Sequence, residues 1–138
     1  MQLDLTSLEN ATVSLGRSIH AANTFAATLP PELKDTVRSG IIQNFEVAYE
    51  LSWKMIKRWL EANLSAESVD GVTRRELFRR AAENRLIDDV DLWMSFHAAR
   101  NETSHTYDNN TAAEVSHSAE HFAAAAQSLL TSLRARND

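Results

Sequence analysis

The sequence predicts an all-α fold, an up-and-down antiparallel bundle of about five helices. In four segments, apolar residues recur at spacings of three and four, which places them on one face of a helix. No segment bounded by turns alternates apolar and polar residues as a half-buried strand would. Helix breakers are few: the prolines are Pro30 and Pro31, and the glycines are Gly16, Gly40 and Gly71. The 138 residues are expected to form a single domain, 1–138, that buries about two-thirds of its unfolded surface.

Two long helices are expected in the first half of the chain. The first covers roughly residues 3–29 and ends at Pro30-Pro31, because a proline disfavours helical geometry in the residue before it. The second covers roughly residues 32–63, about 45 Å at 1.5 Å per residue. Their core-facing stripes are Leu5, Leu8, Thr12, Leu15, Ile19, Ala22 and Ala26 in the first helix, and Val37, Ile41, Phe45, Ala48, Ser52, Met55 and Trp59 in the second.

Three further helices are expected in the second half. Thr73 and Glu76 have capping-box spacing, which predicts a helix that starts near Thr73. A break at residues 86–89 leads into a fourth helix. Thr111 and Glu114 again have capping-box spacing, which predicts that the last helix opens there. The stripe residues are Val90, Trp93, Met94 and His97 in the fourth helix, and Val115, Phe122, Ala126, Leu129 and Leu133 in the last.

Composition excludes several kinds of site. The chain has no cysteine, so disulfides, zinc-thiolate sites, iron–sulfur clusters and thiol catalysis are ruled out. The N-terminal MQLDLTSLEN lacks a basic segment followed by an apolar run, and no apolar stretch is long enough to span a bilayer. We therefore expect a cytoplasmic protein that acts without a membrane. A net charge of −5 argues against coating of nucleic acid through bulk electrostatics, but it leaves room for a local basic cleft.

Charged side chains gather in two places. The segment TRRELFRRAAENR, residues 73–85, holds five arginines, and the ordinary interpretation is a solvated helix face with interspersed glutamates. The alternative is a surface that contacts a phosphate backbone. On the second helix, the spacing allows Glu50–Lys54 and Lys54–Arg58 neighbours, and the ordinary interpretation is an ion-paired, solvated face. There the alternative places Lys54 or Lys57 near a cleft, in contact with RNA or a nucleotide.

Tryptophan and histidine provide weaker signals. Trp53, Trp59 and Trp93 lie on or beside apolar stripes, which favours core or dimer packing over base stacking. His117 and His121 lie four residues apart on the last helix and could bind a metal in principle. No HExxH pattern or thiol accompanies them, so no metal site is expected.

Residues 100–108, RNETSHTYD, interrupt the helical pattern with a block that has no aliphatic side chain. A turn between helices needs only a glycine or an asparagine, so this block carries much more chemistry than a connection requires. On a continuous helix Arg100 and His105 would diverge by about 140°, whereas Arg100 and Tyr107 are expected to share a face whether or not the helix is broken. Arg100 and His105 therefore converge on one ligand only if the helix frays near residues 101–104 or if a second chain completes the site.

The chemistry of this block suits a phosphodiester. An arginine offers a fixed fork of donors for phosphate oxygens, and a histidine can exchange a proton near neutral pH. Cleavage of RNA without a metal needs a base for the 2′-hydroxyl proton and a cation for the charge that grows on the phosphorus oxygens. His105 and Arg100 would serve these two roles. The alternative is a polar helix junction whose arginine, histidine and tyrosine are merely hydrogen-bonded.

Two blocks of the sequence resemble a known family. RNETSHTY, residues 100–107, resembles the motif of the HEPN superfamily, in particular HepT-type toxins: an arginine, four residues, a histidine, any residue and a tyrosine. FEVAYELSWKMIKRWLE, residues 45–61, is similar to the long second helix of nucleotidyltransferase substrate-binding proteins, in which RN-x-x-SHTYD recurs. The order and spacing of the blocks agree with that family, so the resemblance covers most of the chain.

The resemblance implies an up-and-down bundle, like the helical domain of kanamycin nucleotidyltransferase, that forms a homodimer with the two Arg/His pairs facing each other across a cleft. It implies a metal-independent endoribonuclease without a cofactor. A minimal nucleotidyltransferase encoded nearby would neutralise this toxin by transferring AMP to the motif tyrosine. Carried over, Arg100 and His105 are catalytic and Tyr107 is the modified residue. The supporting residues are Asn101, which matches the polar residue that often follows the motif arginine, and Ser104, Asp108 and Lys54.

The same resemblance supports a second hypothesis. Nucleotidyltransferase substrate-binding proteins were named for the idea that the bundle presents a substrate to a nucleotidyltransferase. In that case the chain is a non-catalytic subunit of a two-component nucleotidyltransferase. Arg100 and His105 would then bind a nucleotide or substrate without cleaving RNA.

Overall fold

The computed structural model describes residues 2–137, and five α-helices account for most of them. They are α1 (Thr6–Phe25), α2 (Pro31–Asn63), α3 (Arg74–Glu83), α4 (Val90–Asn101) and α5 (Asn109–Ala135), with two short 3-10 helices, η1 (Ala66–Ser68) and η2 (Glu102–His105). No strand occurs in these residues. The predicted all-α bundle of about five helices is confirmed.

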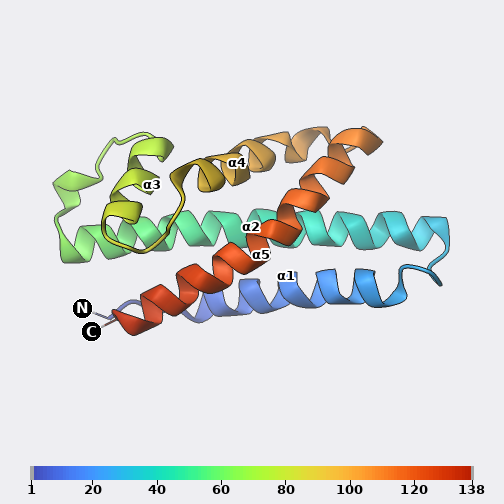
Figure 1. Ribbon diagram of the computed structural model, residues 1–138, viewed down its shortest axis with the longest axis horizontal. Helices are drawn as coiled ribbons and strands as arrows, with labels where there is room; N and C mark the ends of the chain where they lie inside the picture. The colour runs from blue at the N-terminus through green and yellow to red at the C-terminus, as the bar shows by residue number, and fades with distance from the viewer. Residues whose placement is uncertain (1, 138) are drawn as a thin grey trace.

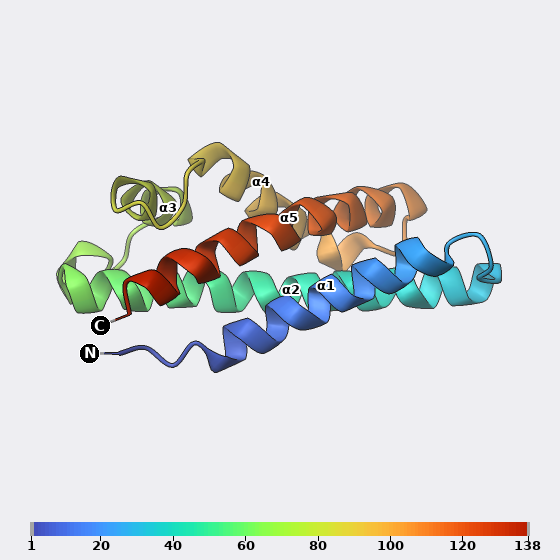
Figure 2. The ribbon, with the colours of Figure 1, turned by 60° about the horizontal axis from the view of Figure 1, so that its bottom comes forward.

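The three long helices, α1, α2 and α5, lie side by side along the long axis of the molecule (Figures 1 and 2). α2, with 33 residues, extends over about 50 Å at 1.5 Å per residue. The short connection after α1 makes α1 and α2 antiparallel neighbours. α3 and α4 form a second layer that packs on α2 and, through α4, also on α5.

The core forms where the predicted stripes of α2 and α5 meet. Phe122 of α5 is fully buried at its centre. Its ring makes edge contacts with Phe45, Trp93 and Phe96, with ring centroids 5.4, 5.5 and 5.1 Å away. One side chain therefore joins α2, α4 and α5. The buried stripe residues are Ile41, Phe45, Ala48, Ser52, Met55 and Trp59 of α2, and Val115, Phe122, Ala126, Leu129 and Leu133 of α5.

The first helix is shorter than the sequence predicts. It ends at Phe25, and Ala26, which the pattern placed on its stripe, is exposed in the following turn. The carbonyl oxygen of Phe25 accepts hydrogen bonds from the backbone N–H groups of Thr28 (3.0 Å) and Leu29 (3.1 Å). The chain thus leaves regular helix geometry several residues before Pro30, in a turn whose two amides share the Phe25 carbonyl.

Of the two predicted helix starts, one is confirmed and one is wrong. The Thr73 hydroxyl accepts a hydrogen bond from the backbone N–H of Glu76 (3.1 Å), so Thr73 caps α3 as predicted. The last helix does not open at Thr111. Asp108 accepts from the backbone N–H of Asn110 (2.9 Å), and α5 begins at Asn109. Aspartate is a strong helix N-cap, so the earlier residue of the two determines the start.

The two ends of the described chain lie together at one end of the bundle (Figure 1). The amide of Asn137 accepts from the backbone N–H of Leu3 (2.7 Å) and donates to the Leu3 carbonyl (2.9 Å). Arg134 also pairs with Glu9 at 3.1 Å. These contacts close α5 onto the start of α1. Within the described residues, none of the helices has the length and apolar character needed to cross a membrane.

Replacement of Phe122 with alanine tests the assigned core. Loss of a fully buried aromatic ring lowers the free energy of unfolding by about 3–5 kcal/mol. Phe25→Ala is the control, because the Phe25 side chain is 55% exposed and its loss is expected to change stability by less than about 0.5 kcal/mol. Denaturant titration followed by circular dichroism measures both values. Equal losses in the two variants would contradict the central place of Phe122.

Candidate active site at the end of α4

The helical path changes within the polar block. α4 ends at Asn101, and residues Glu102–His105 continue as the tighter 3-10 helix η2. The Thr103 hydroxyl donates to the Arg100 carbonyl at 2.8 Å, and the Thr106 hydroxyl donates to the Thr103 carbonyl at 3.2 Å. Side-chain hydrogen bonds of this kind compete with regular helix geometry. The break near residues 101–104, one of the two conditions for convergence of Arg100 and His105, is therefore present.

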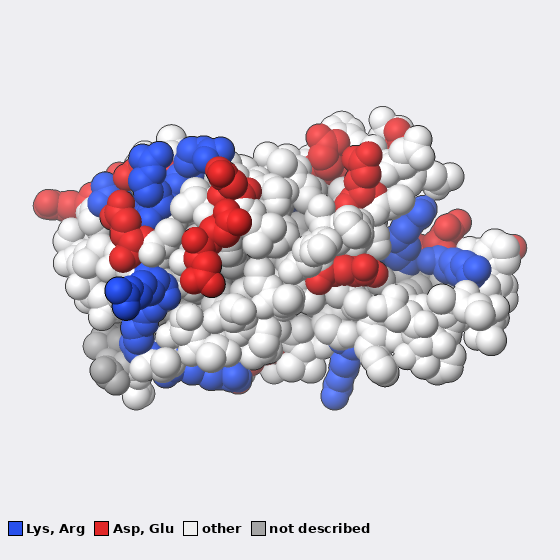
Figure 3. Space-filling view, in the orientation of Figure 1, with Lys and Arg blue, Asp and Glu red and all other residues white. Residues whose placement is uncertain are grey.

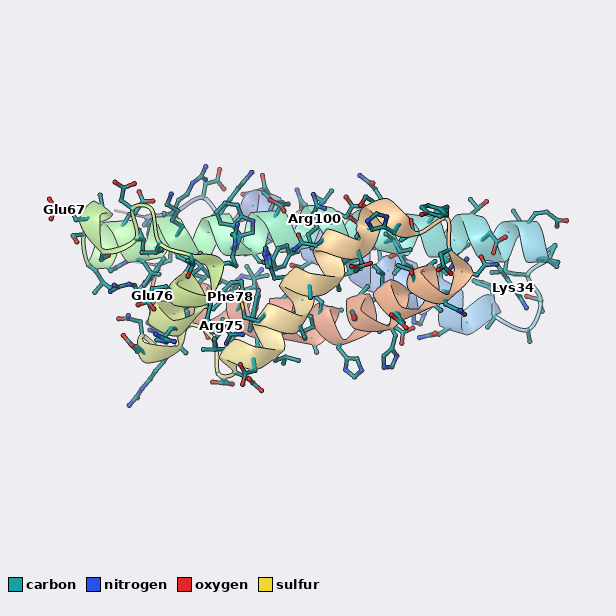
Figure 4. The ribbon with its side chains drawn as sticks, turned by 90° about the horizontal axis from the view of Figure 1, so that it is seen from above. Lys34, Glu67, Arg75, Glu76, Phe78 and Arg100 are labelled. Atoms are coloured by element: carbon teal, nitrogen blue, oxygen red, sulfur yellow. The ribbon has the colours of Figure 1, made fainter. Side chains whose placement is uncertain are left out.

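Arg100 lies on the side of α4 that faces α2 (Figure 4). Its Nε is 3.3 Å from the Glu50 carboxylate, and its Nη1 is 3.9 Å from the Glu46 carboxylate. Nη1 also donates to the Thr103 hydroxyl at 3.1 Å. Among the described residues, no hydrogen bond of Nη2 is found. The guanidinium is thus held in place through two of its nitrogens, and the third remains available to a ligand.

His105 and Tyr107 point into solvent. Tyr107 is 85% exposed, and its ring centroid is 6.3 Å from that of His105. No hydrogen bond within the described chain joins Arg100 to either residue. The helical spacing that put Arg100 and Tyr107 on one face does not apply, because α4 ends between them. A single chain therefore brings His105 and Tyr107 close together, and neither is hydrogen-bonded to Arg100 among the described residues.

The four supporting residues have different environments. Asn101 and Ser104 are exposed on the break, and Asp108 caps α5. Lys54 is exposed, with its ammonium 5.8 Å from the centre of the Trp53 ring. The predicted Glu50–Lys54 pair is replaced by other contacts, since Glu50 approaches Arg100 and accepts from the Trp53 indole N–H at 3.0 Å.

The sequence did not predict that Tyr49 and His97, a hydrogen-bonded pair near Arg100, belong to the candidate site. The Tyr49 hydroxyl lies 2.8 Å from Nδ1 of His97. Burial raises the pKa of the Tyr49 phenol, so this group stays protonated and donates the hydrogen bond. Burial, together with the charges of Arg74 and Arg100, lowers the pKa of His97, while Glu50 opposes this shift. Neutral His97 then carries its ring proton on Nε2. The three-residue spacing from His97 to Arg100 could have revealed their common face.

Most of the arginine-rich segment follows the ordinary interpretation. Arg75 pairs with Asp91 at 3.1 Å, and Arg79 and Arg80 pair with Glu76 at 3.0 and 3.5 Å. Figure 3 shows positive and negative side chains mixed over α3. Arg74 is the exception. Its guanidinium carbon lies 3.5 Å from the centre of the Trp53 ring, so this arginine is turned towards α2.

Comparison with known proteins identifies the family. Residues 3–135 match the family described as "Nucleotidyltransferase substrate binding protein like". The chain belongs to this family. The resemblance inferred from RNETSHTYD and from residues 45–61 is confirmed.

Individual relatives agree with this assignment. A Haemophilus influenzae protein named "Probable ribonuclease HepT" is 37% identical over 109 residues, which cover 78% of this chain and 75% of the relative. A solved Haemophilus influenzae structure, described as the fold of a substrate binding domain of a nucleotidyltransferase, superposes with a TM-score of 0.90 at 32% identity, covering 95% and 99% of the two chains. A Thermus thermophilus structure gives a TM-score of 0.72 at 25% identity and covers 92% and 98%.

The tryptophans and the histidine pair singled out in the sequence have structural explanations. Trp59 and Trp93 are buried, as the packing interpretation predicts. His117 and His121 are exposed, and their Nε2 atoms are 3.2 Å apart. Within residues 2–137 no group of three or more histidine, aspartate or glutamate side chains is arranged to hold a metal ion. The histidine pair thus lacks a third protein ligand in the described chain.

The lowered pKa of His97 predicts a pH dependence of stability. The folded chain binds fewer protons at His97 than the unfolded chain, whose histidine has its usual pKa of 6.5. This contribution to stability is complete above 6.5 and is lost as the pH falls through 6.5 towards the lowered value. His97→Gln lacks this titration and retains Arg74, Arg100 and Glu50. Between about pH 7.5 and pH 5 the wild type is expected to lose more stability than His97→Gln, measured by denaturant titration. Parallel pH profiles would contradict the lowered pKa.

Proposed function

We propose that this protein is a HEPN-type toxin of a toxin–antitoxin pair, a metal-independent endoribonuclease that uses Arg100 and His105. The observation that carries the proposal is the RNETSHTYD block at the end of α4. It joins a guanidinium held by Glu46, Glu50 and Thr103 to a turn that exposes His105 and Tyr107. The relative named "Probable ribonuclease HepT" supports the same activity.

The proposed reaction is an internal transfer at phosphorus. His105 accepts the proton of the RNA 2′-hydroxyl, and the 2′-oxygen forms a bond to the neighbouring phosphorus. The bond from phosphorus to the 5′-oxygen breaks, and this oxygen takes a proton from water. The hydroxide formed from that water takes up the proton held on His105, and the products are a cyclic phosphate and a free 5′-hydroxyl. Arg100 stabilises the negative charge that grows on the non-bridging oxygens. Its Nη2 N–H groups, which the protein does not use in the described chain, are the donors proposed for this contact.

A homodimer completes the proposed site. Within one chain Arg100 is turned towards α2, whereas His105 is exposed beyond the helix break. A second copy that packs against this face would place its own His105 near Arg100, and the reverse contact would follow from two-fold symmetry. The cleft between the two copies would then exclude water from the scissile phosphate.

The proposed partner is a minimal nucleotidyltransferase encoded nearby, which transfers AMP to Tyr107. Tyr107 suits this role because its phenol is 85% exposed and lies beside His105. An AMP group there would bring a phosphate and a purine to the cleft. Its negative charge would compete with the RNA phosphate for Arg100 and so block cleavage.

The second candidate is a non-catalytic substrate-binding subunit of a two-component nucleotidyltransferase. The match over residues 3–135 and the description of the superposed Haemophilus influenzae structure favour it specifically. In this case Arg100 would bind the phosphate of a nucleotide, and His105 would provide a hydrogen bond rather than remove a proton.

Single replacements and mixed dimers test the nuclease. Arg100→Ala and His105→Ala are each expected to lower the rate of RNA cleavage by about 10²–10⁴-fold and to relieve the growth arrest caused by the wild type without its partner. If the two residues act across a dimer, mixing the two inactive variants restores part of the cleavage. Sedimentation at micromolar concentration is expected to show a dimer. A wild type that does not cleave RNA, or a monomer, would contradict the proposal.

Tyr107→Phe separates the modified residue from the catalytic residues. This variant is expected to cleave RNA at a rate within about threefold of the wild type, because the phenol does not take part in the proton transfer or hold the phosphate. It is expected to resist silencing by the partner. Intact-mass spectrometry after co-expression would show AMP on the wild type and none on Tyr107→Phe. AMP on the variant would assign the modification to another residue.

A further inference from the structure

Arg74, the first residue of α3, differs from its neighbours. The guanidinium groups of Arg75, Arg79 and Arg80 each pair with a carboxylate on the surface. Arg74 has no such pair among the described residues, and its guanidinium stacks on the Trp53 ring at 3.5 Å. Stacking occupies the face of a guanidinium and leaves the N–H groups along its edge to bind an acceptor.

Three guanidinium groups have a nitrogen that is shielded from solvent and lacks a hydrogen-bond acceptor within the described chain: Nη1 of Arg74, Nε of Arg80 and Nε of Arg100. Arg80 is paired with Glu76 through Nη2. Nε of Arg100 is 3.3 Å from Glu50, but the contact lacks the geometry of a hydrogen bond. Buried donors without acceptors are costly. A small rotation of the guanidinium that brings such a nitrogen to an oxyanion would remove this cost.

α2 connects Arg100 and Arg74. Glu50 approaches Arg100 and accepts a hydrogen bond from Trp53, on which Arg74 stacks. Glu50 and Trp53 are three residues apart, so their side chains are neighbours on one face of the helix. His97 also lies within the electrostatic influence of both arginines. Arg100, His97 and Arg74 therefore form one strip along α2.

The strip continues into a cavity beyond Arg74. This cavity has a volume of about 220 Å³, and Trp53, Lys57, Thr73 and Arg74 contribute to its lining. A neighbouring cavity shares Lys57 but is otherwise lined by Glu61, Ala66, Glu67 and Asp70. Arg100, Arg74 and Lys57 thus follow one another along α2, with Glu46 and Glu50 beside Arg100, and carboxylates predominate beyond Lys57.

We propose that Arg74, stacked on Trp53, is a second phosphate-binding residue, and that one nucleic-acid strand places separate phosphates on Arg100 and Arg74. Arg100 contacts α2 at Glu46 and Glu50, and Arg74 contacts it at Trp53. The midpoint of the first pair lies about five residues from Trp53, which is about 7 Å along the helix axis. This separation is too wide for one phosphate group to bridge, and it suits a chain of phosphates. The identity of the strand as RNA rests on the proposed function; the phosphate site itself does not.

Binding of an oligonucleotide that cannot be cleaved tests the site directly. The probe is a fluorescein-labelled, single-stranded RNA with 2′-O-methyl groups, titrated with the full chain and followed by fluorescence anisotropy at several salt concentrations. Arg74→Gln is expected to weaken binding about tenfold. Loss of one phosphate contact also lowers the slope of log affinity against log salt by about 0.7. Arg74→Lys keeps the charge and is expected to retain most of that slope.

Arg75→Gln is the matched control. It removes the same charge from the adjacent residue, but Arg75 pairs with Asp91 and lies farther from α2 than Arg100 does (Figure 4). Its salt slope is expected to equal that of the wild type. Equal effects of Arg74→Gln and Arg75→Gln would show a general charge effect and would overturn the proposal. Thermal unfolding by circular dichroism verifies that each variant is folded.

Two further measurements separate the strand from other phosphates and from the proposed activity. ADP is titrated as a competitor: if it binds through Arg74 while the oligonucleotide does not bind, a strand is the wrong ligand. Cleavage of unmodified RNA is measured on the same proteins. A wild type that binds the probe through Arg74 but does not cleave RNA supports this inference and contradicts the nuclease. If the wild type cleaves RNA and Arg74→Gln binds the probe as the wild type does, the nuclease is supported and the phosphate site at Arg74 is contradicted.

Discussion

The structure depends on α2, because each of the other four α-helices packs against it. One side of α2 buries an apolar stripe against α1 and α5, with Phe45 in contact with Phe122. Another side presents Tyr49, Glu50 and Trp53 to α3 and α4. A helix that serves two layers cannot shift along its axis without disturbing both. The apolar packing therefore also holds the polar side chains of the candidate site in register.

The polar contacts at this site balance charge in a partly buried place. Glu46 and Glu50 lie close to Arg100, and Glu50 also interacts electrostatically with Arg74. Burial of two guanidinium groups without carboxylates would be expensive. Two glutamates offset the charge but leave Nη1 of Arg74 and Nε of Arg100 without hydrogen bonds in the described chain. The strip thus carries guanidinium groups whose charge is offset but whose hydrogen bonds are incomplete within the described chain.

The sequence predicts those parts of the molecule that depend on neighbours along the chain. The stripes of α2 and α5 and the Thr73 cap follow from helical spacing and from local hydrogen bonds. The start of α5 was misplaced because Asp108 and Thr111 are both good caps, and the earlier one forms the bond. The RNETSHTYD block was found as a site candidate, but the environment of Arg100 was not. Its partners lie about fifty residues away on α2, and spacing on one helix carries no information about them.

The separation of Arg100 from His105 bears on what a single chain can do. A base must reach the 2′-oxygen while the cation reaches the phosphate of the same linkage, so both groups must lie within hydrogen-bond distance of adjacent atoms. Arg100 is fixed towards α2 by Thr103 and Glu50, whereas His105 has no such contact in the described chain. A rigid cation and a solvent-exposed base suit binding of phosphate in one copy. In the proposed nuclease, cleavage would require that another surface orders His105, and a second copy of the chain would supply such a surface at the same break. For this proposal, oligomeric state and catalysis are therefore one physical question.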